Sequence, residues 1–270
     1  MRTLRILALS PLLLVLGIGW QLWSASSLAR QAIGWGFLSS SAWDPVAGNF
    51  GAWPFLYGTL LTTALALALA APLGVAAAVF LAELAPRALR QPLNSMVSLL
   101  AAVPSVVYGL WGIFALVPWL GFGYASASLI LAIMIVPYIV SLAREALAAV
   151  PRQQAEAAYA LGATRWEVIG RVLLPAARSG IAGGVALAMG RALGETMAVT
   201  MVIGNRPAAG AALFGPGTTL ASAIANEFTE ATSPRYTAAL VELGLVLFAL
   251  TLLANAAARL LSHARARALG

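Results

Sequence analysis

Six stretches of the chain are apolar over a length that can cross a bilayer, which takes about 20 residues. They are separated by charged stretches or by stretches rich in Gly and Pro. The pattern predicts an all-α integral membrane protein with six transmembrane helices. The stretches cover residues 6–23, 57–82, 95–118, 125–143, 179–203 and 238–260. The second holds Pro72 and Gly74, so we expect it to be kinked or tilted.

Composition supports a membrane protein and excludes several kinds of site. The chain is 61% apolar and 9% charged, with a mean hydropathy of +0.89, values outside the range of soluble domains. It has no cysteine, which excludes disulfides, thiolate metal sites and cysteine nucleophiles. The one histidine, His263, lies in a basic C-terminal tail, and we interpret it as a solvated side chain without a functional role.

Arginine predicts the orientation of the chain. With the N-terminus in the cytoplasm, twelve arginines lie on the cytoplasmic side and only Arg30, Arg206 and Arg235 lie outside. This bias predicts cytoplasmic N- and C-termini, and it explains the net charge of +7 without a nucleic acid partner. The first stretch can also be interpreted as a cleaved signal peptide, because Arg2 and Arg5 precede it; the downstream orientation would be unchanged.

Tryptophans gather at or just after the first apolar stretch. Their position favours an aromatic belt at the outer membrane interface over a site where a ligand stacks. The five residues are Trp20, Trp23, Trp35, Trp43 and Trp53.

The polar stretch 144–178 predicts a cytoplasmic elbow of two short helices. A first helix is expected over 153–161, with Gly162 as its left-handed C-terminal cap. Thr164 and Glu167 form a capping box that starts a second helix, running to about Leu173 before the fifth apolar stretch. From these residues alone, the elbow can bind a partner or merely pack beneath its own bundle. The apolar residues expected to be available for docking are Tyr159, Leu161, Trp166 and Ile169.

Two charges lie within the fifth apolar stretch. The segment "GRALGETMAVTMVIGN", residues 190–205, is predicted to continue one helix, so that Arg191 and Glu195 share a face about one turn apart. Charges at that depth are costly and usually functional. Arginine binds an oxyanion through two parallel hydrogen bonds, and the glutamate would neutralise it between passages so that the anion is released. A purely structural ion pair is the alternative.

A row of small residues four apart runs along the same stretch, and Arg191 and Glu195 each follow a member of this row by one residue. Such a row lets another helix approach closely, which favours a seam lining a pathway beside Arg191 and Glu195. The row consists of Ala182, Ala186, Gly190, Gly194 and Ala198.

The elbow resembles the EAA loop of ABC importer permeases, whose pattern is EAA-x3-G-x9-I-x-LP. The only departure is Val172 in place of Ile. The resemblance implies the ABC importer (MetI-like) permease fold, in which the elbow enters a groove of an ATPase subunit through contacts from about Ala155 to Thr164. The residues that match the pattern, and to which it assigns ATPase coupling, are Glu156, Ala157, Ala158, Gly162, Leu174 and Pro175.

A narrower resemblance involves residues 57–260. The segment 190–205, together with "VPSVVYGLWG" (103–112) and "FLAELAP" (80–86), is similar to the PstC family of membrane subunits of bacterial phosphate ABC importers. The sister family PstA reads differently after "GET". The resemblance implies a subunit that forms half of a phosphate pathway, with Arg191 and Glu195 lining it.

The resemblance also implies an organisation, partners and a location. Residues 1–56 would form an N-terminal helix and outer loop, 57–262 the permease domain, and 263–270 a basic cytoplasmic tail. The implied partners are a PstA-like second permease, two PstB-like ATP-binding subunits, a PstS-like extracytoplasmic phosphate-binding protein and inorganic phosphate, in the lipid bilayer of the bacterial inner membrane. No cofactor is implied. Because the chain lacks the pattern G-x-x-x-x-G-K-[ST], ATP hydrolysis is expected from a partner.

Other functions remain open. The elbow would look the same in a PstA-like permease or in one for another oxyanion or small solute; only the Arg191–Glu195 stretch argues for phosphate. An ion-coupled secondary transporter would be expected to show paired repeats and several charged sites, whereas one charged pair is seen here. An intramembrane enzyme is disfavoured, because neither H-E-x-x-H nor G-x-S-x-G occurs.

Overall fold

The computed structural model describes residues 2–210 and 212–267, and their regular structure is helical apart from an antiparallel bridge between Asp44 and Asn49. The side chain of His263 and the last residues of the predicted tail, 268–270, lie outside the description. The helices, with π-helical turns marked η, are α1 (Arg2–Ala25), α2 (Ser27–Ile33), α3 (Gly36–Ser39), α4 (Trp53–Val79), η1 (Phe80–Leu84), α5 (Arg87–Ala102), α6 (Ser105–Ala115), α7 (Val117–Leu120), α8 (Tyr124–Ala148), α9 (Arg152–Ala160), α10 (Arg165–Val168), η2 (Ile169–Leu173), α11 (Leu174–Leu193), α12 (Met197–Ile203), α13 (Leu220–Glu227) and α14 (Pro234–Arg267).

The described chain contains four helices long and apolar enough to cross a membrane, or up to six spans if each of two bent helix pairs counts as one. This confirms the predicted all-α membrane fold. The four are Trp53–Leu84, Tyr124–Ala148, Arg165–Leu193 and Pro234–Ala258; the bent pairs are Ser10–Ala25 with Ser27–Ile33 and Arg87–Ala102 with Ser105–Ala115.

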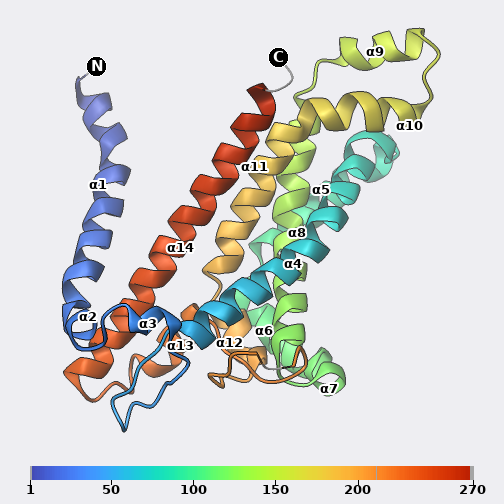
Figure 1. The fold of residues 1–270 in the computed structure, drawn as a ribbon. Coiled ribbons are helices and arrows are strands. Elements are labelled where there is room, and N and C mark those ends of the chain that lie inside the picture. The colour runs from blue at the N-terminus through green and yellow to red at the C-terminus, as the bar shows by residue number, and fades with distance from the viewer. Residues whose placement is uncertain (1, 211, 268–270) are drawn as a thin grey trace.

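The span that holds Pro72 is longer than a straight crossing needs. Trp53–Leu84 has 32 residues, about 48 Å of helix at 1.5 Å per residue, against a hydrocarbon core of about 30 Å. Figure 1 shows α4 running obliquely beside α8. The tilt expected from the sequence therefore accommodates the excess length.

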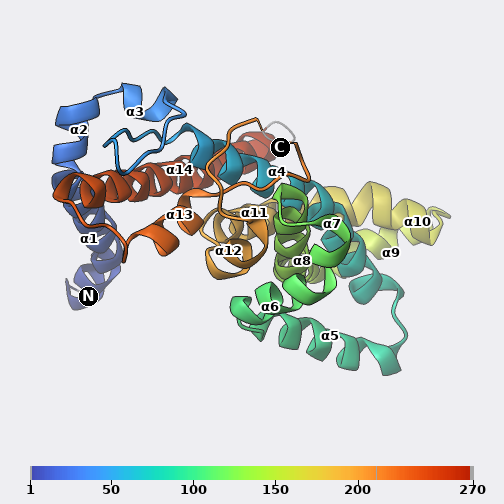
Figure 2. The ribbon, with the colours of Figure 1, turned by 90° about the horizontal axis from the view of Figure 1, so that it is seen from below.

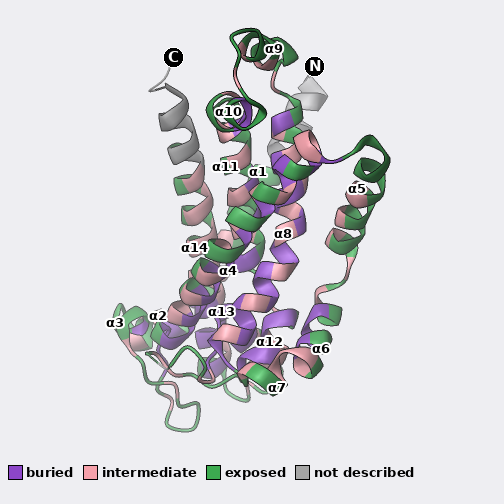
Figure 3. Ribbon diagram, turned by 90° about the vertical axis from the view of Figure 1, so that its right-hand side faces the viewer, coloured by how far each residue is buried: buried purple, intermediate pink, exposed green. Residues whose placement is uncertain are grey.

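The third predicted span, 95–118, is wrong as a single straight helix. α5 ends at Ala102, α6 begins at Ser105, and the two are bent by 92°. The cause is Pro104, which lacks a backbone donor and moves the preceding residue out of the helical region; Val103 has φ −62° and ψ 128°. Every residue of α5 is described and none is buried, and Figure 3 shows this helix standing apart from the bundle.

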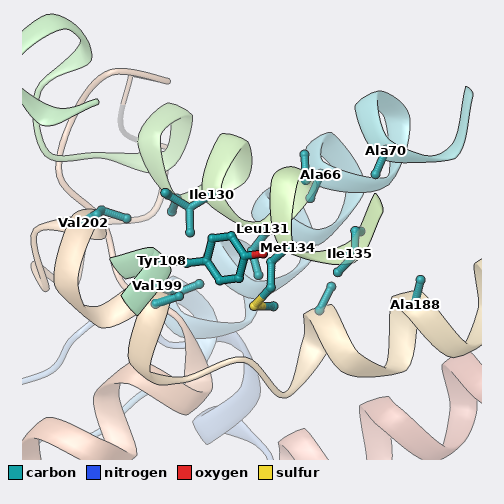
Figure 4. Close-up of a cluster of buried hydrophobic side chains, with 14 of the residues drawn as sticks. Ala66, Ala70, Tyr108, Ile130, Leu131, Met134, Ile135, Ala188, Val199 and Val202 are labelled. Carbon is teal, nitrogen blue, oxygen red and sulfur yellow. The ribbon is translucent and has the colours of Figure 1, made fainter. Parts of the chain in front are cut away.

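The core lies around α8, which packs against α4, α11 and α12. Ile130, Met134 and Ile135 are completely or almost completely buried. Figure 4 shows Ile130 on the side of Val199 and Val202 of α12, and Ile135 on the side of Ala188 of α11. This packing places the middle of α8 at the centre of the bundle.

The closest helix contacts are made by glycines. A Cβ atom at Gly74 of α4 would lie 2.7 Å from Ile139, and one at Gly184 of α11 would lie 2.8 Å from Leu142. Along α11, the buried small residues Gly184, Ala188 and Ala192 share this face. Replacing either glycine would therefore push α8 away.

The small-residue row predicted in the fifth span is thus out of phase with the observed contact. Ala182 is exposed, and a Cβ at Gly190 would approach Asn255 of α14 at 3.3 Å, not α8. A row of small residues permits close packing but does not by itself choose the face that is used.

The outer loop, residues 34–52, packs onto α4, α13 and α14. Trp43 lies edge-on to Phe50 and Phe55, with centroid separations of 5.1 and 4.6 Å. Its Nε1 donates to Glu227 Oε2 at 2.7 Å, and Tyr236 Oη donates to the same oxygen at 2.6 Å. Trp43 is therefore part of a packed cluster in which a hydrogen-bond acceptor satisfies its N–H. The aromatic belt at the outer interface stays a prediction.

The first helices are joined to α14 by an ion pair. Arg30 Nη1 lies 3.4 Å from Glu242 Oε2, and the guanidinium stacks 3.7 Å from the centre of the Trp23 ring.

Figure 1 shows the Arg2 end of α1 and the Arg267 end of α14 at the same end of the bundle as α9 and α10, with α2, α3, α7 and α13 at the other. Figure 2 gives the same bundle from the latter end.

Candidate functional site

The first helix of the elbow, α9, ends in a motif made by local hydrogen bonds. Gly162 adopts φ +85°; its N–H donates to the Tyr159 carbonyl at 2.9 Å, and the Ala163 N–H donates to the Ala158 carbonyl at 3.1 Å. These two bonds define a Schellman motif, which needs a left-handed residue that glycine adopts without strain. The predicted cap at Gly162 is confirmed. The motif also explains why the glycine stands four positions after Ala158, because the residue that follows the glycine donates to the Ala158 carbonyl.

The second helix begins at the predicted capping box. Glu167 N–H donates to Thr164 Oγ1 at 3.4 Å, and Thr164 N–H donates to Glu167 Oε2 at 2.9 Å. Its predicted end near Leu173 is wrong, because α10, η2 and α11 form a continuous helical segment from Arg165 to Leu193. Pro175 lies inside this continuous segment, two residues after the π-helical turn η2, and it donates no helical hydrogen bond.

The elbow has an inner and an outer face. Ala155, Ala158 and Leu174 are partly buried against a cluster formed by α4, α8, α10, η2 and α11. We call the outer apolar residues Tyr159, Leu161 and Trp166 the docking face; their exposed fractions are 45, 90 and 68%. Glu156, Ala157 and Pro175 are also exposed. Figure 3 shows α9 and α10 as largely exposed at the end of the bundle.

Ile169, predicted to be available for docking, is only 4% exposed and packs in the same cluster. The continuous helix explains this, because it turns Ile169 of η2 inward beneath α8. The expectation is therefore wrong for this residue and correct for the three members of the docking face.

A cleft of about 400 Å³ lies between the elbow and the bundle. Its walls come from η1, α5, α8, α9 and η2, and it contains the EAA glutamate, Glu156. The other charged residues that line it are Glu83, Arg90, Arg144 and Arg152.

The second candidate region is a break in the helix near the middle of the bundle. α11 ends at Leu193, and α12 begins at Met197. Glu195 is 9% exposed, and its Oε1 accepts the backbone N–H of Ala198 at 3.3 Å. A carboxylate at the start of a helix satisfies a donor that lacks a partner there. The prediction of one continuous helix through 190–205 is therefore wrong.

Arg191 and Glu195 consequently do not occupy one helical face. Within the described residues the ion pairs are Arg30–Glu242 and Arg171–Glu167, and none joins Arg191 to Glu195. Instead the Arg191 guanidinium stacks over Tyr138 of α8, with its Cζ 4.6 Å from the ring centre. Arg191 is exposed on the surface of the chain.

Tyr138 places this arginine near the middle of the membrane-spanning region. It lies between Tyr124 and Ala148, the ends of α8, about 21 Å from one and 15 Å from the other along the helix axis. An arginine at this depth, stacked on an aromatic ring instead of paired with a carboxylate, keeps its N–H donors available for an anion.

Sequence reasoning missed Tyr138. The available signal was its position, because Tyr is enriched at membrane interfaces and this one lies in the middle of an apolar span. Across the described residues there is no group of three or more His, Asp or Glu side chains placed to hold a metal ion.

The chain is similar to known transport proteins. Residues 70–267 match the family described as binding-protein-dependent transport system inner membrane component. The phosphate transport system permease protein PstC of Mesorhizobium japonicum is 45% identical, covering 95% of this chain and 87% of the relative. PstC of Pasteurella multocida is 42% identical, covering 96% and 89%.

Solved structures share the fold. A chain of the inward-facing MetNI methionine ABC transporter matches 80% of this chain and 94% of its own length, with a TM-score of 0.63 and 20% identity. A chain of a bacterial alginate ABC transporter matches 95% and 92%, with a TM-score of 0.67 and 16% identity. These likenesses confirm the MetI-like architecture. Together with the sequence matches, they show that the chain belongs to the binding-protein-dependent inner membrane permeases, and within them to the PstC family.

Proposed function

We propose that this chain is the permease subunit of an ATP-driven phosphate importer and forms half of its translocation pathway. The observation that carries the proposal is Arg191, an arginine at mid-depth whose guanidinium stacks on Tyr138 and which takes part in none of the ion pairs of the described residues. The relatives of 41–45% identity that are named as phosphate permeases support phosphate as the anion.

In this proposal Arg191 binds the oxyanion through its N–H edges, since two parallel charged hydrogen bonds match two oxygens of one phosphate. Glu195 supplies the opposing charge from within the helix break. The anion must bind weakly enough to be released. A movement of α12 relative to α11 would bring the Glu195 carboxylate toward the Arg191 guanidinium and displace the anion.

We further propose that the elbow couples the pathway to ATP hydrolysis. The docking face, with the exposed Glu156 and Ala157, enters a groove of an ATPase subunit. The other matching residues determine the shape of the elbow. Ala158 and Gly162 form the cap of α9, and Leu174 and Pro175 lie where the elbow passes into α11. Force on α9 then reaches Arg191 along α11.

The chain is a multi-pass inner membrane subunit and not an enzyme, and the ATPase is a separate subunit. We assign as partners a PstA-like permease, two PstB-like ATPases and a PstS-like phosphate-binding protein. Both termini and the elbow lie in the cytoplasm, which fits the arginine bias and their position at one end of the bundle. Residues 57–262 form the permease domain, preceded by the helix and outer loop of 1–56 and followed by the tail 263–270.

Uptake of labelled phosphate tests the substrate. The chain would be produced with its three kinds of partner subunit in cells that lack their own high-affinity phosphate uptake. We expect ATP-dependent uptake that excess unlabelled phosphate abolishes and excess sulfate leaves unchanged. Equal inhibition by sulfate, or uptake of another labelled oxyanion with no phosphate uptake, would contradict the assignment of phosphate while leaving the permease fold untouched.

A further inference from the structure

The bend between α5 and α6 is bound to the bundle by two tyrosine hydroxyls. Tyr108 Oη donates to the Leu100 carbonyl at 2.8 Å, and Tyr138 Oη donates to the Ala101 carbonyl at 2.9 Å. Both carbonyls lie in the last turn of α5, where α-helical N–H partners run out; the Leu100 carbonyl also accepts the backbone N–H of Val103 at 3.3 Å. The Tyr138 hydroxyl therefore supplies a donor to the Ala101 carbonyl, and the Tyr108 hydroxyl adds a second donor to the Leu100 carbonyl, beside the 92° bend.

Tyr138 differs from Tyr108 in what its ring contacts. The ring of Tyr108 packs in the hydrophobic cluster with Met134 and Val199, as Figure 4 shows. The ring of Tyr138 instead lies beneath the Arg191 guanidinium, 4.6 Å from its Cζ. One side chain of α8 thus contacts both the bend and the arginine of the proposed anion pathway.

We propose that Tyr138 is a positioning residue, which holds Arg191 ready for the anion and links it to the α5–α6 bend. The inference rests on the proposed function of Arg191. It adds a residue that acts through Arg191 without contacting phosphate itself.

The first part of the inference follows from the geometry of a guanidinium. Its five N–H donors point outward in the plane of the group, so an aromatic ring against one flat face leaves all of them available. A carboxylate partner would occupy two of these donors. The ring also restricts the arginine rotamers, so less conformational entropy is lost when the anion binds.

The second part follows from the exposure of α5. All of its residues are described and none is buried, so few side-chain contacts oppose its movement relative to the bundle. The carbonyl that accepts from Tyr138 moves with α5. A change in the bend therefore acts on the ring that supports Arg191, and occupancy of the arginine acts on the bend in return.

Three variants separate the ring from the hydroxyl. Tyr138→Met removes both while filling similar space, Tyr138→Phe keeps the ring, and Tyr108→Phe removes the matching hydroxyl bond without touching Arg191. The measurement is uptake of labelled inorganic phosphate by the complete transporter over a range of concentrations, with the abundance of each variant and its co-purification with the partner subunits measured in parallel.

We expect Tyr138→Met to raise the apparent KM about threefold to thirtyfold, the range that follows from cation–π strengths. Tyr138→Phe should restore the KM to within about twofold of the wild type, because the cation–π contact needs only the ring. Both phenylalanine variants should lower the maximal rate, since each removes one hydroxyl bond to the last turn of α5. An unchanged KM in Tyr138→Met, or an equally raised KM in Tyr138→Phe, would overturn the positioning role.

A double substitution distinguishes failure of this inference from failure of the proposed function. If Tyr138 acts through Arg191, adding Tyr138→Met to Arg191→Lys should change the KM less than it does in the wild type. Equal changes in both backgrounds would contradict the inference. Normal uptake by Arg191→Ala would instead remove Arg191 from the pathway, and a Tyr138→Met effect that persists without Arg191 would show a role in packing alone.

Discussion

The elbow precedes α11 and the helix break at 194–196 follows it, and different interactions determine the two structures. In the elbow, the bonds that form the caps join residues within five positions of one another, such as Ala163 to Ala158 and Thr164 to Glu167. At the break, Arg191 stacks on Tyr138 of another helix. Local bonds can be inferred from local spacing, whereas the direction of a charged side chain in a bundle depends on which helix packs beside it.

The same contrast separates the proposed roles of the two regions. The elbow exposes apolar side chains on a rigid support, as expected for a surface that receives a partner. The break places one charge on the surface of the chain and buries the other near the start of α12. Substitutions in the elbow should therefore affect assembly and coupling, and substitutions at the break should affect the handling of the anion.

Replacing Arg191 should have the largest effect. Arg191→Ala removes the donors of two charge-assisted hydrogen bonds, so we expect phosphate uptake to fall at least ~100-fold while the partner subunits still co-purify. Arg206→Ala, which removes an exposed arginine of the segment between α12 and α13, is the control and should leave uptake normal. If Arg191→Ala transports normally at normal abundance, the break and the anion pathway are unrelated.

Replacing Gly162 should have a smaller effect of a different kind. Gly162→Val forces a β-branched residue into φ +85°, at a cost of about 1–2 kcal/mol, so we expect roughly tenfold less ATPase subunit to co-purify or uptake to fall by a similar factor. Gly170→Val is a matched control, because that glycine is also exposed with open space at its Cβ but has a helical backbone. Equal losses in the two variants would show that added bulk, and not the cap, is responsible.

Replacing the charge of Glu195 should have the smallest effect. Glu195→Gln keeps an oxygen that can accept the Ala198 N–H but removes the charge that would compete with the anion. We expect normal abundance and a maximal uptake rate lowered by about threefold to tenfold, the effect of ~1 kcal/mol. A wild-type rate would mean that Glu195 serves only to start α12, and its place in the pathway would be lost.

The apolar pattern and the helix caps allowed most of the correct predictions of the fold. Apolar length located the membrane-spanning segments, since crossing a bilayer imposes a minimum run. Gly162 and the Thr164–Glu167 pair placed the turns of the elbow to the residue. Errors arose wherever a contact between distant segments decided the outcome, as for Ile169, which the continuous helix through η2 turns into the core.

Pro104 and Gly194 show why interruptions within apolar runs are harder to predict. Each lies in a stretch hydrophobic enough to be a single span, and hydropathy averages over such a residue. Whether the helix bends, breaks or continues depends on whether neighbouring side chains satisfy the carbonyls and N–H groups that are released. Here Tyr108 and Tyr138 satisfy carbonyls at the first interruption, and Glu195 satisfies an N–H at the second.

By itself, the sequence determined the membrane-spanning class, the caps of the elbow and the presence of an arginine within the membrane, because these depend on residue type and on spacing along one segment. Only the tertiary structure decided which face of α11 packs on α8, that Arg191 and Glu195 are separated, and that Tyr138 supports the arginine. The physical reason is that a charge within a bundle takes the partner that packing brings to it, and packing joins α8 to α11 across the 25 residues between Ala148 and Leu174.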